Sequence, residues 1–366
     1  MQTRLSWQSL PDSAKAVFEM EPAMSFESFT HKVEYGELLA MVLRALTENG
    51  YDERIASPIA RTIVDCERDG VSSHGLLRLP GFVESVRSGW ADGRVLPSIV
   101  SESPSMRVVD ARNGFTHLAL EESRADLSAM ARKTGTAILL IRNAHHFAAL
   151  WPDIEGFADD GLLAFSCVNS RARVTAWGSE KPVFGTNASA FACPRAGGSP
   201  VVWDQAASVM SQGDILLASR DGLKLPAGVG VDRFGVPTDD PNAILDGGAL
   251  QTFGGVKGAS IAFMIEVLAA VLSGSVDGFD SQAQGTLPSK CGQFVLLIDS
   301  ARAGVDVAVR VESLMKAAGV AGVNRTPGSR RYDRRAKSLA DGIVITESAR
   351  QLLEDLSAGQ TKHRFS

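Results

Sequence analysis

The sequence predicts an α/β protein with helices at both ends of the chain. In the middle of the chain, over residues 136–168, two apolar strand patterns flank an amphipathic helix. Helical patterns fill residues 33–88 and return over residues 303–356. At 366 residues the chain is too long for one small core, so we expect two or three subdomains.

The first part of the chain is predicted to be an extension followed by three helices. Residues 1–25 have weak periodicity, and Met24 is an alternative start of the protein. A glycine after a helical pattern favours a helix end, and proline favours a helix start. The predicted helices are therefore residues 33–49, before Gly50; residues 53–68; and residues 82–88, between Pro80 and Gly89.

The rest of the chain is predicted to alternate between strands and helices. Short apolar runs predict strands over residues 105–110, 136–141, 162–168, 201–203 and 294–299. Helical patterns predict helices over residues 118–133, 148–159, 258–272, 303–318 and 347–356. Residues 273–292, rich in Gly, Ser and Gln, are predicted to form a long surface loop.

Composition excludes several classes of function. Hydrophobic residues make up 45% and charged residues 22% of the chain, as in a soluble globular enzyme, and the net charge of −5 gives no reason to expect a nucleic-acid partner. The four cysteines form no CxxC pair, so we expect free buried thiols and no metal site. The longest apolar helix pattern, residues 259–272, is interrupted by Glu266 and is too short to span a membrane. With no secretory signal in the sequence, we expect a cytoplasmic protein.

Two adjacent histidines mark a candidate site. His145 and His146 stand where a strand ends and a helix is expected to begin, so a ligand there would meet imidazole edges and free backbone N–H groups. A strand end with two ordinary polar residues is the competing interpretation. A second polar cluster favours a functional site, because His74 lies within Ser72-Ser73-His74-Gly75 and Arg78 follows it by four residues.

A Rossmann nucleotide site is not predicted. No strand pattern is followed by GxGxxG and a helix. Gly228-Val229-Gly230 lacks the third glycine, and Pro226 stands close before it. A nucleotide would therefore bind in a different kind of domain.

Several blocks of the sequence together resemble one enzyme family. Residues 69–80, DGVSSHGLLRLP, are similar to the signature of the malate/L-lactate dehydrogenases that lack a Rossmann fold. Further similar blocks are Gly185-Thr186-Asn187 and residues 204–208, 254–258 and 327–331. The run from His145 to Asp153, with residues 225–228 and 244–248, resembles more specifically the Δ1-piperideine-2-carboxylate/Δ1-pyrroline-2-carboxylate reductases. The resemblance covers roughly residues 30–350, so it does not rest on one short match.

The resemblance implies an NAD(P)H-dependent ketimine reductase that forms a homodimer. It implies a malate/L-lactate dehydrogenase-like fold with an unusual, non-Rossmann NAD(P)-binding domain. The expected parts are a helical substrate and dimerisation domain over residues 26–105, an NAD(P)H-binding α/β region over residues 106–300, and a helical part over residues 301–366 that returns to the first domain. The chain departs from the family pattern at Ser72, Ala188 and Ala207, where an acidic residue, proline and threonine are usual. These departures bear on coenzyme and substrate preference, not on the fold.

The chemistry of ketimine reduction suits the residues of the Ser72–Arg78 cluster. A cyclic C=N bond with a carboxylate needs a cation for the carboxylate, a nicotinamide against the carbon and a proton donor for the nitrogen. Arg78 suits the carboxylate, because a guanidinium grips it with two parallel hydrogen bonds, although a surface ion pair is the alternative. His74 suits proton donation near neutral pH, with a packed or capping histidine as the alternative. Ser73 is expected to hydrogen-bond the imidazole or the substrate, unless it caps a helix, and no GxSxG makes it a nucleophile.

Two aspartates are candidates to orient His74. Asp204 follows the strand pattern of residues 201–203, where α/β proteins place ligand contacts. By resemblance, Asp214 matches the reductases' catalytic aspartate, Asp204 borders the coenzyme and Thr186 contacts the substrate. A turn or helix-cap role is the alternative for both aspartates.

Coenzyme phosphates need cations and backbone N–H groups. Arginines over residues 325–335 supply charge, and residues 254–258 offer close backbone approach at a helix start; a solvated surface and a plain turn are the alternatives. The resemblance implies NADPH, with NADH as the alternative. The implied coenzyme contacts are His146, Phe147, Ala148, Ala149, Leu150, Asp204, Gln205, Ala206, Gly255, Val256, Lys257, Arg330, Arg331 and Arg334.

Three functions are compatible with the sequence. The first is reduction of Δ1-pyrroline-2-carboxylate to L-proline and of Δ1-piperideine-2-carboxylate to L-pipecolate. The second is a 2-hydroxy-acid dehydrogenase of malate, lactate or ureidoglycolate type on the same fold. The third is a non-enzymatic sensor of nucleotides or small acids, which the joint presence of Ser73, His74, Arg78 and Asp214 disfavours. The run over residues 145–153 separates the first from the second by resemblance alone, and the preferred imine is not fixed by the sequence.

Overall fold

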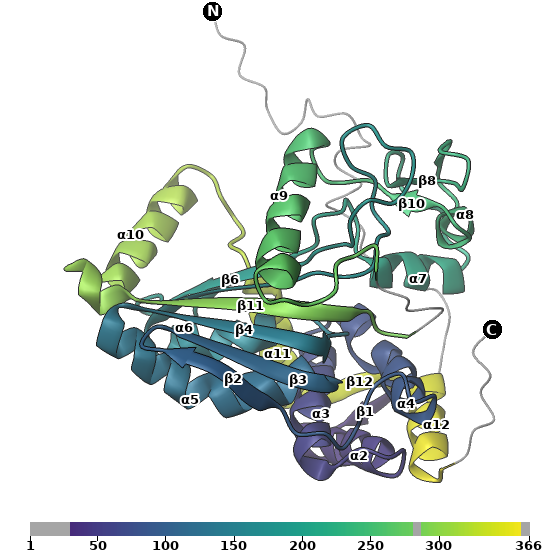
Figure 1. Cartoon of the computed structure of the whole chain (residues 1–366), viewed down its shortest axis with the longest axis horizontal. Helices are drawn as coiled ribbons and strands as arrows, with labels where there is room; N and C mark the ends of the chain where they lie inside the picture. Colours follow the sequence, from purple (N-terminus) through teal and green to yellow (C-terminus); the bar gives the residue numbers. More distant parts are fainter. Residues whose placement is uncertain (1–29, 281–286, 360–366) are drawn as a thin grey trace, which may run out of the picture.

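The structure, a computed structural model, describes residues 30–280 and 287–359, so the predicted extension over residues 1–25 lies outside the described residues. Its centre is a seven-stranded mixed sheet in the order β2-β3-β4-β11-β5-β6-β7 (Figure 1). Strands β3 and β4 run parallel, and the other neighbours are antiparallel. The strands are β2 (Ser98–Ser103), β3 (Met106–Phe115), β4 (Thr136–His145), β5 (Leu162–Val168), β6 (Ser189–Cys193), β7 (Val201–Gln205) and β11 (Lys290–Asp299).

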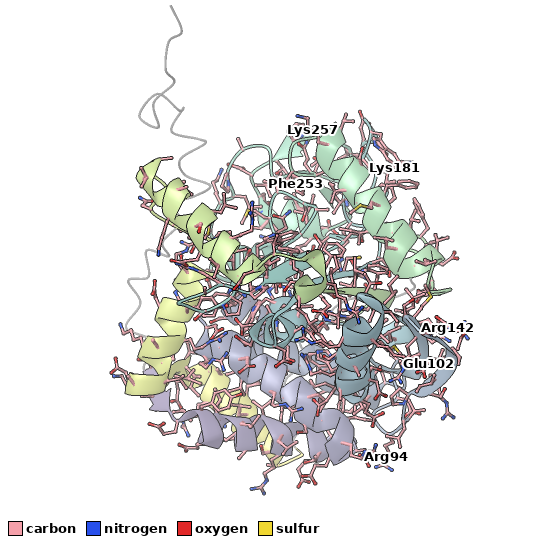
Figure 2. The ribbon with its side chains drawn as sticks, turned by 90° about the vertical axis from the view of Figure 1, so that its left-hand side faces the viewer. Arg94, Glu102, Arg142, Lys181, Phe253 and Lys257 are labelled. Atoms are coloured by element: carbon pink, nitrogen blue, oxygen red, sulfur yellow. The ribbon has the colours of Figure 1, made fainter. Side chains whose placement is uncertain are left out.

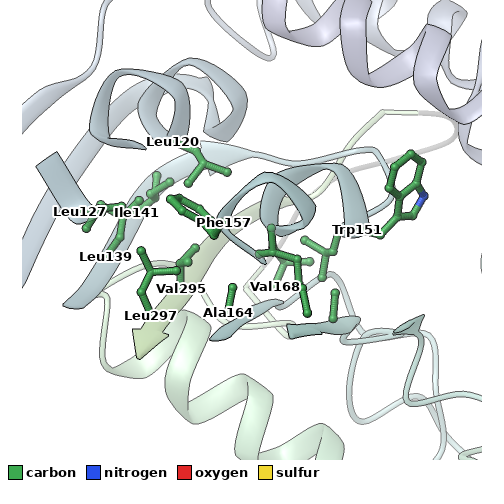
Figure 3. Close-up of a cluster of buried hydrophobic side chains, with 14 of the residues drawn as sticks. Leu120, Leu127, Leu139, Ile141, Trp151, Phe157, Ala164, Val168, Val295 and Leu297 are labelled. Atoms are coloured by element: carbon green, nitrogen blue, oxygen red, sulfur yellow. The ribbon is translucent and has the colours of Figure 1, made fainter. Parts of the chain in front are cut away.

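Helices cover both faces of this sheet, because its central strands are apolar on both sides. Leu139 and Leu140 are neighbours on β4 and therefore point to opposite faces. Leu139 packs with the helices of one face, where Phe157 lies over the strands (Figure 3). Leu140 packs with Ile265 on the other face. The covering helices are α5 (Thr116–Thr134) and α6 (Trp151–Asp159) on the first face, and α9 (Val256–Glu266), which continues as a π-helical turn over Val267–Val271, on the second.

The two ends of the chain build one helical region (Figure 1). Strand β1 (Thr30–Val33) pairs antiparallel with β12 (Ile343–Thr346), which brings residues more than three hundred positions apart into register. Leu38, Ile59 and Leu353 share its buried core. The helices of this region are α2 (Tyr35–Thr47), α3 (Glu53–Arg68), α4 (Leu79–Arg87) and α12 (Glu347–Ser357). The prediction of a helical region made from both chain ends is confirmed.

A third, smaller apolar core lies among short elements between β7 and α9. Val174, Ile215, Val229 and Leu250 are buried in it. The elements around it are α7 (Gln212–Arg220), α8 (Pro241–Leu245) and a sheet of β10 (Ala249–Leu250), β8 (Gly230–Val231) and β9 (Pro237–Thr238).

Most predicted helices and strands are present with shifted ends, and the larger differences have physical causes. The helix predicted over residues 303–318 is interrupted, because Gly304 adopts a φ of 69° and Asp306 caps a new helix, α10 (Val307–Val320). Residue 33, predicted to be helical, lies in β1 because β12 supplies a distant pairing partner. The predicted loop over 273–292 ends where β11 begins at Lys290, and residues 281–286 lie outside the described part.

Burial and membrane topology add three facts. All four cysteines are buried free thiols, as predicted. Across residues 30–280 and 287–359, no helix has the length and apolar composition needed to cross a membrane. In the same ranges, no three His, Cys, Asp or Glu side chains are grouped as they would be around a metal ion.

Candidate active site

The polar cluster predicted around Ser73 forms two consecutive 3-10 turns between α3 and α4. Gly70 adopts a φ of 69° just after α3 and reverses the chain. The Glu67 carboxylate then holds the turns, since it accepts hydrogen bonds from the Leu76 backbone N–H at 2.7 Å and the Ser72 hydroxyl at 3.0 Å. Within this frame, Ser73 Oγ and His74 Nδ1 lie 3.0 Å apart.

Arg78 is a buried guanidinium that forms no ion pair with any of the described residues. Its side chain is 5% exposed, and among the described residues its Nε has no hydrogen-bond partner. Its guanidinium carbon lies 4.5 Å from the centre of the Phe147 ring. Burial lowers the pKa of Arg78 to about 10, although the nearby Asp214 carboxylate opposes that shift. A buried cation with unused donors is costly unless an anion arrives to pair with it.

The amino-terminal turn of α7 closes against this cluster. Ser211 caps the helix by accepting from the Asp214 backbone N–H at 3.1 Å. Gly213 allows the close approach, because a Cβ there would stand 2.6 Å from Arg78 Nη2 and 2.8 Å from the Ser73 carbonyl oxygen. The structure therefore brings Ser73, His74, Arg78 and Asp214 together. The Asp214 charge acts on Arg78, whereas the hydrogen bond to the imidazole comes from Ser73.

His74 is poised as a neutral imidazole in the free protein. Burial lowers its pKa to about 3, and the electrostatic interactions with Arg78 and then His146 add to this effect. An anion bound to Arg78 would offset the guanidinium charge and raise the pKa of His74 again.

The loop from His146 to Leu150, between β4 and α6, is anchored at its far end by Asp204. One oxygen of that carboxylate accepts from the backbone N–H groups of Leu150 at 2.7 Å and Trp151 at 3.0 Å. Burial raises the pKa of Asp204, while these two donors and the Arg331 charge favour its ionised form. The predicted contacts in this loop and at Asp204 are thus neighbours, and Gln205 and Ala206 follow Asp204 directly.

The ring of His146 is buried and contacts other side chains of the protein. Its Nε2 donates to the Asp153 carboxylate at 3.3 Å, and Asp153 also accepts from Gln293 Nε2 at 2.7 Å. His117 stacks on His146 with ring centres 5.3 Å apart. Burial opposes the ionisation of Asp153, but its contacts with His146, His117 and Gln293 outweigh burial and leave its pKa below the usual range.

Thr186 connects to the cluster of Ser73, His74, Arg78 and Asp214 through the chain that follows β7. Its carbonyl oxygen accepts from the Ala207 backbone N–H at 2.7 Å, and Ala207 precedes the α7 cap Ser211 by four residues. Its hydroxyl lies 3.5 Å from that of Ser170, at the limit of a hydrogen bond. A hollow of about 260 Å³ lies between the segment after Ser170 and Gln212, the neighbour of Gly213.

Arg330, Arg331, Arg334 and Arg335 lie in the first turns of α11 (Ser329–Asp341), a helix that was not predicted from the sequence. Arg331 donates to the Val202 carbonyl at 2.8 Å and lies over the Trp151 ring, and its Nη1 has no partner among the described residues. Arg334 donates to the Gly70 carbonyl at 2.7 Å. Burial and the charges of Arg325 and Arg334 lower the pKa of Arg330. Within the described residues, no carboxylate forms an ion pair with Arg330.

The glycine turn before α9 occupies a different place. Gly255, Val256 and Lys257 are exposed, and Lys257 lies at the outer edge of the molecule (Figure 2). The close helix entry has a packing role, since a Cβ at Gly258 would stand 2.0 Å from the Phe253 carbonyl oxygen. The structure therefore groups the other predicted coenzyme contacts but leaves this turn at the surface, where its coenzyme role is untested.

Several residues of the site were not predicted. Glu67, Asp153 and Gln293 hold the candidate residues in place, yet each lies in an ordinary helix or strand pattern. His117 is buried without a hydrogen-bond partner on either ring nitrogen among the described residues. Only the tertiary fold brings these polar groups together, so local sequence patterns carry no signal for them.

The family model of malate/L-lactate dehydrogenase matches residues 33–354. The chain belongs to the malate/L-lactate dehydrogenase family. As a member of this family of dehydrogenases and reductases, it is an oxidoreductase that uses a nicotinamide coenzyme.

Relatives within the family are similar over nearly their whole length. A Δ1-pyrroline-2-carboxylate/Δ1-piperideine-2-carboxylate reductase of Pseudomonas syringae pv. tomato is 44% identical over 90% of this chain and 97% of its own. The solved Δ1-piperideine-2-carboxylate reductase of that organism has a TM-score of 0.87 over 89% of this chain and 99% of its own. A sulfolactate dehydrogenase of Chromohalobacter salexigens is 34% identical over 81% of this chain and 89% of its own. The malate dehydrogenase of Entamoeba histolytica, 21% identical with a TM-score of 0.84 over 90% of this chain and 98% of its own, shares the fold.

Proposed function

We propose that this protein reduces cyclic ketimine carboxylates, Δ1-pyrroline-2-carboxylate to L-proline and Δ1-piperideine-2-carboxylate to L-pipecolate, with NADPH. The observation that supports this most strongly is the buried Arg78, whose Nε has no hydrogen-bond partner among the described residues, next to the Ser73–His74 pair. The names of relatives at 40–44% identity agree with this substrate class.

Arg78 binds and orients the substrate in this proposal. Its guanidinium forms paired hydrogen bonds with the ring carboxylate, while the Phe147 ring fixes the plane of the guanidinium. Thr186 contributes a hydroxyl to the same site. Since Arg78 is already buried, little further desolvation of the protein is needed when the anion binds.

His74 delivers the proton to the imine nitrogen. The bound carboxylate offsets the Arg78 charge, so the pKa of His74 rises when the substrate is present. Ser73 holds Nδ1, which leaves Nε2 to face the substrate. Proton delivery is thereby coupled to substrate binding, because the free protein keeps His74 neutral.

A nicotinamide coenzyme supplies the hydride when bound, and the described residues fit such a group. Arg331 Nη1 and Trp151 Nε1, two donors with no hydrogen-bond partner in the described part of the chain, lie beside the loop that Asp204 anchors. Arg325, Arg330 and Arg334 place positive charges near one another at the start of α11, which favours the extra phosphate of NADPH.

We expect Arg330→Ser to lower kcat/KM for NADPH about tenfold and to leave that for NADH nearly unchanged. Equal losses with both coenzymes would reject this role.

The proposal includes a homodimer in the cytoplasm. The outward face of α9 and its continuation is apolar, with Val256, Phe263, Val267 and Val271 each at least 36% exposed, although a surface helix is normally polar on that face. A second copy meeting the same face across a twofold axis would bury it. Light scattering should give twice the chain mass, and Phe263→Glu should give monomers.

The proposed cytoplasmic location agrees with the four free thiols, since free thiols are typical of a reducing compartment.

Coenzyme oxidation with four substrates tests the proposed reaction. Purified protein would be assayed with NADPH and NADH against both cyclic imines, pyruvate and oxaloacetate in parallel. We expect kcat/KM for an imine to exceed that for either 2-oxo acid. A clear preference for pyruvate or oxaloacetate would support a 2-hydroxy-acid dehydrogenase instead, and no turnover would support a sensor.

A further inference from the structure

Glu266 is a buried charged side chain at the end of the mainly apolar helix α9. It ends α9 where the π-helical turn begins, and it is 7% exposed. Its carboxylate accepts three hydrogen bonds. Oε1 accepts from Asn169 Nδ2 at 3.1 Å and from the Gly278 backbone N–H at 2.8 Å, while Oε2 accepts from Asn187 Nδ2 at 2.7 Å. Glu266 thus joins three segments that are far apart in the sequence.

Asn187 is the partner closest to the proposed substrate. It is fully buried and adopts a φ of 36°, which asparagine tolerates better than most residues. Its Nδ2 also donates to the Ala262 carbonyl at 3.0 Å, and its Oδ1 accepts from the Ser170 backbone N–H at 3.1 Å. Thr186 precedes it directly, so the orientation of Asn187 sets the backbone that carries the Thr186 hydroxyl.

We propose that Glu266 is a positioning residue that, through Asn187, holds the Thr186 hydroxyl in register with Arg78 for substrate binding. The proposal rests on the proposed function, in which Thr186 contacts the substrate. The chain from Thr186 leads through its hydrogen bond with Ala207 to the cap of α7, which closes on Arg78. A shift at Asn187 would therefore change the spacing between the two substrate contacts.

The surroundings of Glu266 explain why a carboxylate, rather than a neutral side chain, stands at this position. Burial raises the pKa of Glu266 although three N–H groups stabilise its charge. A buried carboxylate is costly unless hydrogen bonds compensate its lost hydration. Asn169, Gly278 and Asn187 all present N–H groups to Glu266, although the Asp277 charge opposes its ionisation.

Glu266→Gln breaks one link of this network selectively. If the amide oxygen keeps the bonds to Asn169 and Gly278, its NH₂ group faces the NH₂ group of Asn187. We expect kcat/KM for the imine to fall about tenfold to a hundredfold, chiefly through KM, while the Kd of NADPH and the Tm change little. Glu312→Gln, on the outer helix α10, is the matched control and should match wild type.

A double-mutant cycle with Thr186→Val separates positioning from general damage. If Glu266 acts through the Thr186 hydroxyl, Glu266→Gln should add little loss once that hydroxyl is gone. Full additivity of the two losses would overturn the proposal. So would wild-type kcat/KM in Glu266→Gln, or a parallel loss of NADPH binding and Tm. A wild-type protein that prefers pyruvate would reject the proposed substrate alone, and the same variants would then be compared on pyruvate.

Discussion

At the scale of single residues, the proposed chemistry depends on Arg78, a buried cation that forms no ion pair within the part of the chain that the structure describes. Arg78 was predictable from its spacing to His74, but its burial was not. The sequence also placed Asp214 beside His74 as an orienting group. In the structure, Asp214 acts electrostatically on Arg78 and Ser73 contacts the imidazole. The difference arises because Gly213 lets the α7 turn approach the guanidinium directly.

Arg78→Lys tests the bidentate contact. Lysine keeps the charge but replaces the planar fork with a point charge. We expect KM for the imine to rise and kcat/KM to fall by about 10- to 100-fold, with NADPH affinity unchanged. Steady-state kinetics at saturating NADPH gives both constants, and an unaltered KM would show that the carboxylate binds elsewhere.

The protonation of His74 can be followed directly. NMR titration of the free wild-type protein should show an imidazole that stays neutral well below pH 6.5, since burial and the charge of Arg78 lower its pKa to about 3. Arg78→Gln removes one of these causes, so the pKa of His74 should rise. A fall or no change would refute the electrostatic coupling.

Replacement of His74 tests its catalytic role. His74→Ala should bind NADPH normally but lose about 10²- to 10⁴-fold in kcat, as expected when a general acid is removed. Wild-type kcat in this variant across pH 6 to 9 would mean that the proton comes from solvent or from an iminium that is already protonated.

At the scale of elements, long amphipathic helices and apolar strands were predictable, while short or distant pairings were not. Strand β1 forms a strand only by pairing with the distant β12, and the small strands β8, β9 and β10 span two residues each. Helix α11 was not predicted, because its closely spaced arginines indicated a charged surface or a phosphate site rather than a helix. The helix nevertheless packs Arg331 and Arg335 over Trp151, through cation–π contacts that no local pattern reveals.

The hydrogen bonds between Asp204 and the start of α6 can be tested by substitution. Asp204 holds the backbone of Leu150 and Trp151, so Asp204→Ala should free the loop from His146 to Leu150. We expect the Kd of NADPH, measured by fluorescence, to rise about tenfold. Asp204→Asn keeps an acceptor oxygen and should lose less. Equal effects of the two substitutions would contradict an anchoring role.

At the scale of the whole molecule, three histidines buried as neutral rings should make the fold sensitive to acid. Burial lowers the pKa of His74 and His117 to about 3 and that of His145 to about 4. The unfolded chain binds their protons near pH 6.5, so stability is full above that pH and falls as the pH drops below it. At one pH unit below 6.5, each of these three histidines lowers the free energy of unfolding by about 1 kcal/mol.

His117→Phe isolates one of these contributions. The phenyl ring preserves the edge-on contact with Phe82 and the stacking on His146 but carries no titratable group. Urea unfolding of wild type and variant at pH 7.5 and 5.5 should show a smaller acid-induced loss of stability in the variant. An equal or larger loss would mean that His117 is not linked to acid unfolding.

The central claim, that the Arg78 site prefers a cyclic ketimine to a 2-oxo acid, is tested most directly by competition. The protein would be given equal concentrations of Δ1-pyrroline-2-carboxylate and pyruvate with NADPH carrying deuterium at the transferable position, and the products analysed by mass spectrometry. The ratio of labelled products gives the ratio of the two kcat/KM values. We predict that proline labelled on the carbon bearing the carboxylate dominates. Labelled lactate as the main product would contradict the account.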